Sequence, residues 1–281
     1  MTEGFIKREQ AGVCWLEPAA ILAAGGVRGG FSTRLGGVSK ANRASLDLGL
    51  RRNDDVDTAR ENFRRLFGAA GIKGKPAVLS QIHSDRSVFV TEESPARGLS
   101  LMREMEADAM ICDRPGTVLI THHADCAPVF LYDPEARVIA LVHAGWRGAA
   151  ACIAAKCAER MICDYGCRQE RMLAAIGPCI SECCFETHRE VPDAMLAALG
   201  ADALPAIKPI PERQEKYRVD LKLLNKIWLQ KSGVETVDVC PDCTACRPDR
   251  FWSHRRTGGE RGSLAALIML PRENTNKEES L

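Results

Sequence analysis

The sequence predicts one α+β domain with a mixed, largely antiparallel sheet and helices packed outside it. Short apolar runs joined by tight turns fill residues 107–148, a pattern typical of neighbouring strands. Apolar residues at helical spacing, as at 55–71, alternate with these runs along the chain. No internal repeat or long biased linker divides the 281 residues. We therefore expect a single domain over 1–281, with frayed ends at 1–12 and 271–281.

The first third of the chain predicts a strand, a long loop, a helix and an interrupted strand. Gly, Ser, Asn and Asp surround short apolar runs at 27–55, which indicates a strand followed by an ordered loop. The helix over 55–71 has Asp55 as its expected N-cap. Residues 77–92 then alternate as in a strand, and a polar break at 83–85 divides them.

The middle of the chain predicts three successive strands and a helix. The strands lie within 107–148, with turns at 113–116 and 133–135. Directly after Gly148 the apolar pattern becomes helical, and we expect a helix over 149–166. A strand, a glycine turn and a helix form a common arrangement for exposing a reactive side chain.

The last third predicts two further helices between strands. A strand at 172–176 precedes a helix that begins near 187–191, and a second amphipathic helix covers 217–234. A strand then leads into the Cys-rich loop 240–246, and the apolar run at 264–270 forms the final strand.

Charge and composition argue against several classes of protein. A formal net charge of +1 without a long basic run predicts no nucleic-acid partner. No window approaches the roughly 18 consecutive apolar residues of a membrane span, and the charged N-terminus lacks a secretory signal. Thirteen Cys in such a chain indicate reduced thiols in the cytoplasm. We expect a cytoplasmic monomer that acts on a small molecule.

Cys126 and His143 are expected to lie opposite each other on neighbouring strands. Counting outward from a turn near 133–136 brings both side chains to a similar level of the hairpin. A thiolate and an imidazole at that separation suit either a metal site or a Cys–His nucleophilic pair.

A metal site needs a third ligand, and His83 is the candidate. It interrupts an apolar strand pattern, where a buried polar side chain requires a partner. Three protein ligands with an open fourth position are typical of catalytic zinc. The alternative is three unrelated histidines, each hydrogen-bonded to the backbone.

Strand periodicity sorts the neighbours of Cys126. A period of two selects His122 as the residue on the same face, and His123 is expected to face away. The same period places Asp125 on the opposite face. We take Asp125 as the candidate general acid or base; the alternative is that it holds a loop or orients an arginine.

Two arginines are candidates for binding an anionic group of the substrate. Arg147 stands at a turn between a strand and a helix, where backbone N–H groups also favour an anion. Arg34 lies at the edge of an earlier loop, and the SHRR segment at 253–256 offers further arginines. Together they suit a substrate that carries phosphate or carboxylate.

The remaining cysteine-rich segments are predicted to be free loop thiols. CPDCTAC, at 240–246, resembles half of a zinc ribbon, but no second CxxC pair follows it. IGPCISECC, at 176–184, likewise lacks metal-ligand partners nearby in the sequence. Neither GxGxxG nor a P-loop motif is present, which argues against nucleotide cofactors of those types.

As a set, the motifs resemble the bacterial YfiH/YlmD-type proteins, a family also described as laccase-like multicopper polyphenol oxidases or LACC1-type purine nucleoside phosphorylases. They run from about residue 30 to 270 in the order FSTRLGGVS, LGLRRNDD, QIHS, ADAMICDRPG, ADCAPVFLYD, HAGWRG, AAIGPCISECCFE and CTACRPDRFWSHRR. The combination of ADC, HAGWRG and an upstream QIH is the most specific part.

The resemblance implies a single domain of layered α/β/β/α architecture with a CNF1/YfiH-like fold. It implies a zinc ion, with copper less favoured, held by His83, Cys126 and His143. It also implies a purine nucleoside enzyme, active in phosphorolysis of adenosine, inosine and methylthioadenosine and in adenosine deamination. A laccase activity and the editing of peptidoglycan precursors have been attached to the family as well.

We therefore expect a zinc-dependent purine nucleoside enzyme in which Arg147 and Arg34 position phosphate. The alternative is an amide hydrolase of cell-wall precursors, with Cys126 as the thiolate nucleophile and His143 as its base. Copper polyphenol oxidation is least favoured, because one three-ligand site in a chain with six His cannot assemble a trinuclear cluster.

Three positions depart from the family's usual motifs. Asp47 stands where Asn is common, the pair His122-His123 precedes ADC in place of Thr or Ala, and His254 stands at an aromatic position. Asp47 and His122 are the residues expected to alter substrate preference.

Overall fold

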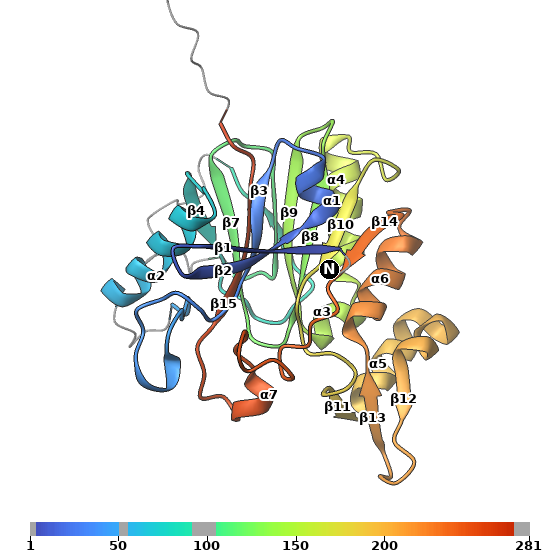
Figure 1. Cartoon of the computed structure of the whole chain (residues 1–281). Helices are drawn as coiled ribbons and strands as arrows, with labels where there is room; N and C mark the ends of the chain where they lie inside the picture. Colours follow the sequence, from blue (N-terminus) through green and yellow to red (C-terminus); the bar gives the residue numbers. More distant parts are fainter. Residues whose placement is uncertain (1–3, 51–55, 92–104, 273–281) are drawn as a thin grey trace, which may run out of the picture.

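The computed structural model describes residues 4–50, 56–91 and 105–272, and within them two six-stranded sheets lie face to face (Figure 1). The first sheet contains, in spatial order, β1 (Phe5–Gln10), β2 (Val13–Pro18), β3 (Arg28–Ser32), β15 (Leu264–Met269), β7 (Thr117–His123) and β4 (Lys75–Val78). The second contains β14 (Thr236–Val239), β10 (Leu173–Ile176), β8 (Ala127–Asp133), β9 (Val138–Ala144), β6 (Ala109–Cys112) and β5 (Ser87–Phe89). Only the pairs β4–β7, β5–β6 and β10–β14 are parallel among these, so the expected mixed, largely antiparallel arrangement is confirmed.

Strands with two buried faces create the layers. Every residue of β8 and β9 is buried, and alternate side chains enter two different cores. Phe130 and Tyr132 pack between the sheets with Phe31 of the first sheet, whereas Val129 and Leu131 point to the helices outside the second sheet. The α/β/β/α architecture implied by the resemblance is thus confirmed.

Helices cover the outer face of each sheet, as Figure 1 shows at the left and right of the molecule. On the first sheet, α2 (Val56–Ala69) buries Phe63 and Leu66 against β7 and β15. The second sheet is covered by α3 (Trp146–Ala150), α4 (Ile153–Tyr165), α5 (Glu190–Leu199) and α6 (Leu221–Lys231). Shorter elements complete the fold: α1 (Ala19–Ala23), α7 (His254–Thr257), the 3-10 helices η1 (Ala41–Arg43) and η2 (Gly200–Ala206), and a small sheet of β11 (Glu186–His188), β13 (Lys216–Val219) and β12 (Ile207–Pro209).

The chain crosses from the first sheet to the second at residues 124–126, which corrects the prediction of one continuous strand there. β7 pairs with β15 and β4, whereas β8 pairs with β9 and β10. Asp125 lies in the left-handed region with φ of 93°, so the extended backbone is interrupted. Cys126 therefore precedes β8 instead of lying inside a strand. The two halves of the predicted 77–92 strand, β4 and β5, are likewise in different sheets.

Two predicted helices have other boundaries in the structure. The helix predicted over 217–234 begins only at Leu221, where the Asp220 carboxylate caps the N–H groups of Lys222 and Leu223 at 2.9 and 3.0 Å. The residues before it form β13, because they pair with β11. The helix predicted over 149–166 is divided into α3 and α4 by Cys152, whose φ is 56°.

The prediction of a frayed N-terminus is wrong for residues 5–10. These residues form β1 along β2, and Phe5 is buried between the two sheets. The expected N-cap Asp55 and most of the polar C-terminal segment fall outside the described residues. Among the residues that are described, no helix has the length and apolar character needed to cross a membrane.

Candidate active site

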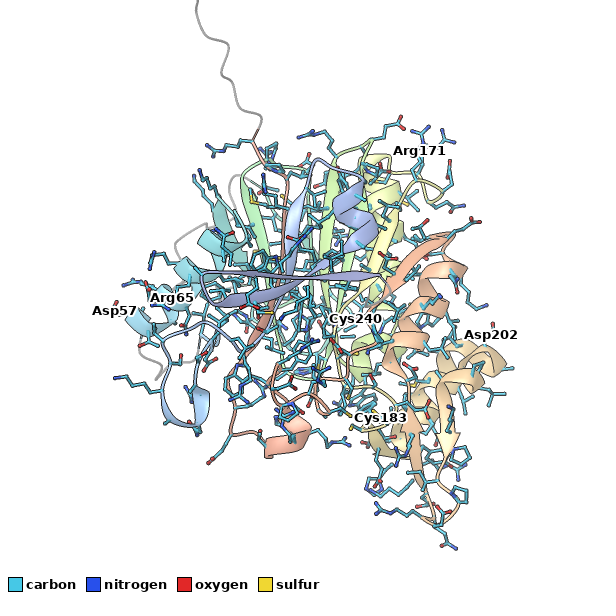
Figure 2. All side chains as sticks on the ribbon, viewed as in Figure 1. Asp57, Arg65, Arg171, Cys183, Asp202 and Cys240 are labelled. Atoms are coloured by element: carbon cyan, nitrogen blue, oxygen red, sulfur yellow. The ribbon has the colours of Figure 1, made fainter. Side chains whose placement is uncertain are left out.

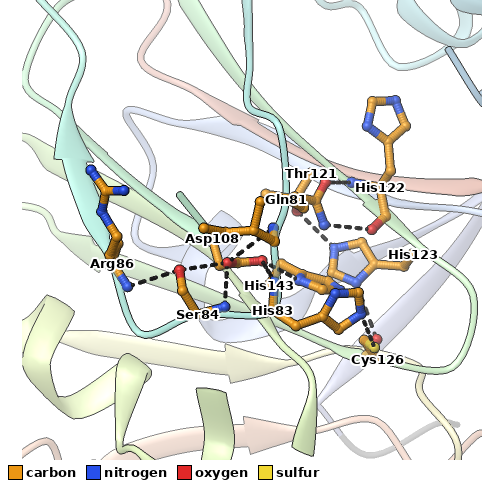
Figure 3. A network of polar contacts seen from close by, with 11 residues as sticks. Gln81, His83, Ser84, Arg86, Asp108, Thr121, His122, His123, Cys126 and His143 are labelled. Carbon is orange, nitrogen blue, oxygen red and sulfur yellow. Dashed lines mark hydrogen bonds and ion pairs between the residues drawn. The ribbon is translucent and has the colours of Figure 1, made fainter. Parts of the chain in front are cut away.

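His83, Cys126 and His143 come from three separate segments and lie together in the structure (Figure 3). Their ligand atoms all lie within 4.8 Å of one another. His83 Nε2 is 3.9 Å from Cys126 Sγ, and the rings of His83 and His143 meet edge to face with centroids 5.0 Å apart. The structure thus brings together the three residues that spacing indicated. Pro128, and not Cys126, is the residue that pairs with His143 in the ladder.

A buried carboxylate, Asp108, supports this trio and was missed in the sequence. It accepts hydrogen bonds from the backbone N–H groups of Ile82, His83 and Ser84 at 3.3, 3.1 and 2.6 Å, and from the Ser84 hydroxyl at 2.8 Å. It also accepts from His143 Nδ1 at 2.9 Å. These bonds hold His83 in its left-handed conformation, with φ of 60°, which is uncommon for a residue with a side chain. An aspartate directly before the apolar strand β6 is the signal that could have revealed it.

The electrostatics of the trio favour a thiolate. Burial raises the pKa of Cys126, but the charge of His143 and hydrogen bonds from His143 and His83 lower it to about 6. Burial lowers the pKa of His143, and Cys126 and Asp108 outweigh that effect and raise it to about 9. For Asp108, hydrogen bonds from His143 and Ser84 overcome burial and hold the pKa at about 2. Cys126 is therefore ionised at neutral pH, as both a metal ligand and a nucleophile require.

The donor set fits a zinc ion with an open coordination position. The Asp108 carboxylate accepts from Nδ1 of His143 and leaves Nε2 of that ring on the side of Cys126. A carboxylate behind a ligating histidine fixes the ring tautomer and is typical of zinc sites. Two imidazole nitrogens and one thiolate leave the fourth position of a tetrahedral ion free for another molecule.

His123 is the neighbour of Cys126, so the selection of His122 by strand period was wrong. Nδ1 of His123 lies 3.1 Å from the Cys126 carbonyl oxygen, and Nε2 lies 2.7 Å from Thr121 Oγ1. Burial lowers the pKa of His123 well below its usual range, so this ring is neutral. His122 instead points away from the cluster, as Figure 3 shows, and meets Phe63 edge to face. The period fails because of the left-handed turn just before Cys126.

Asp125 connects the crossing segment to two loops. Its carboxylate accepts from Thr244 Oγ1 at 2.6 Å, from Ser253 Oγ at 3.0 Å and from the backbone N–H of Arg255 at 2.7 Å. The side chain borders the cavity described next, but three donors already occupy its oxygens. This geometry favours the loop-holding role over proton transfer.

The trio opens into a cavity of about 610 Å³, a volume suited to a small-molecule ligand. Apolar side chains such as Trp146 and Phe185 line it. Arg255 and Arg261 bring positive charge to the same cavity. Asp47 does not line it but accepts hydrogen bonds from the N–H groups of two lining residues, Gly49 and Ser263, at 2.8 and 2.7 Å. His254, by contrast, is itself a lining residue.

Arg34 and Arg147 lie outside the lining of this cavity. The Arg34 guanidinium donates to the carbonyl oxygens of Pro248 and Ala44 at 3.0 and 2.8 Å and stacks 3.6 Å above the Trp252 ring. Arg147 is exposed on α3 and stacks 4.2 Å from the ring of its neighbour Trp146. The arginines that reach the cavity come instead from α7 and the segment after it.

Comparison with known proteins identifies the family. Residues 28–271 match the family model described as multi-copper polyphenol oxidoreductase laccase. The chain belongs to this family. The crystal structure of Bacillus licheniformis YfiH matches this laccase-family chain with a TM-score of 0.84 at 29% identity, over 94% of this chain and 98% of that one. YlmD from Geobacillus stearothermophilus matches with a TM-score of 0.83 at 29% identity, over 96% and 100%.

Curated relatives of the laccase family carry a different functional name. A Shigella flexneri protein named purine nucleoside phosphorylase YfiH is 35% identical over 245 residues, which cover 86% of this chain and 95% of that protein. The resemblance to YfiH/YlmD-type proteins is confirmed by both kinds of match.

Gly145→Ala is expected to weaken zinc binding to this site roughly 10–100-fold. This is the loss of metal affinity typical of substitutions that disturb the orientation of metal-binding side chains. A Cβ at Gly145 would lie 2.9 Å from His83 Cδ2 and 3.3 Å from Cys126 Sγ, so it would push these two side chains apart. Competition with a chromophoric zinc chelator measures the affinity. Gly68→Ala on α2, where a Cβ meets nothing within 4 Å, is the matched control. Equal zinc affinities for the two variants would contradict the assigned ligand positions.

Proposed function

We propose that this chain is a purine nucleoside phosphorylase that works with a zinc ion held by His83, Cys126 and His143. The observation that carries the proposal is the carboxylate-supported trio at the edge of a cavity that also contains two arginines. The names of curated relatives support the same substrate class. When bound, the ion supplies Lewis-acid polarisation of the substrate.

The cavity contains both aromatic side chains suited to a base and cations suited to phosphate. Trp146 and Phe185 provide aromatic surface against which a purine can stack. Arg255 and Arg261 provide guanidinium groups suited to hold a phosphate dianion.

The chain's own residues then act mainly by placement and charge. A phosphate oxygen held by the arginines forms a bond to C1′ of the ribose, and the bond from C1′ to the purine nitrogen breaks. The purine leaves with the bonding electron pair and takes up the proton that the attacking hydrogen phosphate releases. Holding both reactants in one cavity lowers the entropic cost of this step, and the arginines offset charge as it moves.

A product analysis tests the proposal. The purified chain is incubated with adenosine, inosine or methylthioadenosine, with and without phosphate, and products are separated by chromatography. We expect release of free base that requires phosphate, together with ribose 1-phosphate or its methylthio analogue. Inosine formed from adenosine would add the deaminase activity, whereas base release independent of phosphate, or no base release, would overturn phosphorolysis.

Arg261→Gln is expected to raise the KM for phosphate roughly 10–100-fold, because one charge-assisted hydrogen bond contributes about 1.5–3 kcal/mol. Initial rates at varied phosphate and saturating nucleoside give this value. Arg147→Gln is the matched control, since Arg147 lies on the surface of α3 outside the cavity lining. If Arg147→Gln raised the KM for phosphate strongly and Arg261→Gln left it unchanged, Arg147 would be the phosphate-binding residue, as the sequence indicated.

A second candidate is the Cys–His amide hydrolase, favoured by the line from Asp108 through His143 to Cys126. That order resembles an acid–base–nucleophile arrangement, and the Cys126 thiolate suits it. The two functions differ in their response to zinc removal, because zinc on the thiolate prevents its attack on a substrate. Copper oxidation has weaker support: among the described residues, ligand side chains gather in two groups, and neither has the histidines of a trinuclear cluster.

A further inference from the structure

Four cysteines from two distant loops form a second cluster outside the active site. Cys183 and Cys184 lie between β10 and β11, and Cys243 and Cys246 lie in the loop after β14. Figure 2 labels Cys183 near the small sheet. The four sulfurs all lie within 4.8 Å of one another, and none is in a disulfide. Each segment therefore supplies the other with the sulfur atoms that it lacks nearby in its own sequence.

The separations between the sulfurs suit a single tetrahedral ion. Cys246 Sγ lies 3.5 Å from Cys183 Sγ and 3.4 Å from Cys184 Sγ, and the latter two are 3.8 Å apart. Four ligands about 2.3 Å from a central zinc lie about 3.8 Å from each other, by tetrahedral geometry. Cys243 and Cys246 also have the CxxC spacing that is common in structural zinc sites.

Backbone N–H groups surround one sulfur of the cluster, and cations lie beside its loops. The backbone N–H of Ser181 donates to Cys243 Sγ at 3.3 Å, and the N–H groups of Ala245 and Cys246 face the same sulfur. Three guanidinium groups bind carbonyl oxygens within the cluster: Arg218 at Cys183 (2.6 Å), Arg255 at Cys184 (2.9 Å) and Arg256 at Ala245 (3.0 Å). A zinc ion with four thiolates carries two excess negative charges, which these arginines offset.

We propose that Cys183, Cys184, Cys243 and Cys246 bind one zinc ion in a closed, structural site, separate from the ion of the His83 trio. The site would join the two loops that wall the active-site cavity. Phe185, which follows Cys184, lines that cavity, and Thr244, between the other two ligands, donates to Asp125. The proposal does not depend on the reaction that the cavity supports.

Metal counting on untagged protein, purified under reducing conditions, tests the proposal. We expect about two zinc ions per wild-type chain, and about one in each of the single variants Cys246→Ser and His143→Ala. Cys163→Ser, which changes an exposed cysteine of α4 outside both groups, is the control and keeps two.

X-ray absorption at the zinc edge of His143→Ala isolates the second ion without altering any of its ligands. We expect a first shell of four sulfurs at about 2.3 Å. The proposal would be overturned by a coordination shell that contains nitrogen, or by a Cys246→Ser variant that binds as much zinc as wild type. A disulfide among the four cysteines in the reduced protein would also overturn it. None of these readouts involves nucleoside turnover, so failure of the proposed function would be recognised separately.

Discussion

His143→Ala is expected to lower phosphate-dependent turnover of purine nucleosides by about 10³-fold or more and to remove the metal ion of the His83 trio. The substitution deletes one ligand and leaves the Asp108 carboxylate buried without its ring partner. With two ligands left, the site no longer holds zinc tightly, and the Cys126 thiolate loses its strongest neighbouring charge. Metal analysis and initial rates on the same preparation measure both effects.

His188→Ala provides the control for this prediction. His188 belongs to β11, and its Nε2 lies 2.7 Å from Lys216 Nζ, outside the cavity lining. We expect that variant to keep both its metal and its rate. If His143→Ala retained wild-type turnover, the trio would not be the reactive centre.

Asp108→Ala is expected to lower the free energy of unfolding by about 3–5 kcal/mol, the range typical of breaking a buried charged pair. Asp108 is fully buried, and its loss leaves His143 Nδ1 and the N–H groups of residues 82–84 without their acceptor. Urea unfolding at neutral pH measures the change. Asp113→Ala, at an exposed aspartate just after β6, is expected to stay within about 0.5 kcal/mol of wild type. Equal stability of the two variants would show that Asp108 does not stabilise the loop at residues 82–84.

The pKa of Asp108 also determines how the free energy of unfolding changes with pH. Hydrogen bonds hold the pKa of Asp108 at about 2 in the folded chain, below its unfolded value of about 4. Its stabilising contribution is therefore complete above about pH 4 and is lost as the pH falls from there towards 2. Wild type is expected to lose more stability than Asp108→Asn over that interval, as urea unfolding at each pH would show. Parallel losses in the two proteins would contradict this assignment.

Local patterns predicted much of the fold because the short apolar runs of β9 and β15, bounded by turn residues, and the helical period of α2 each indicate one type of element. The hairpin of β8 and β9 around its turn at 133–137 also follows from sequence, and it placed Cys126 near His143. The crossing at 124–126 did not follow, because a left-handed Asp125 leaves no mark on an apolar strand pattern. Because of that one conformation, His123 and not His122 lies beside Cys126.

The features that sequence reasoning missed depend on contacts between distant segments. Asp108 meets its partners through the pairing of β6 with β9, and β13 is a strand only because β11 lies beside it. The two cysteine pairs gain ligand partners only when their loops fold together. No local periodicity or turn motif in the sequence predicts these contacts.

The most direct test of the central claim is turnover measured against occupancy of the His83–Cys126–His143 site. Occupancy is the metal bound per wild-type chain in excess of the amount bound by His143→Ala, followed during removal with a chelator and readdition of zinc. We predict that phosphate-dependent release of purine base falls in proportion to this occupancy and returns with it. Turnover that survives complete metal removal and is then abolished by iodoacetamide would contradict the account and assign the chemistry to Cys126 as a nucleophile.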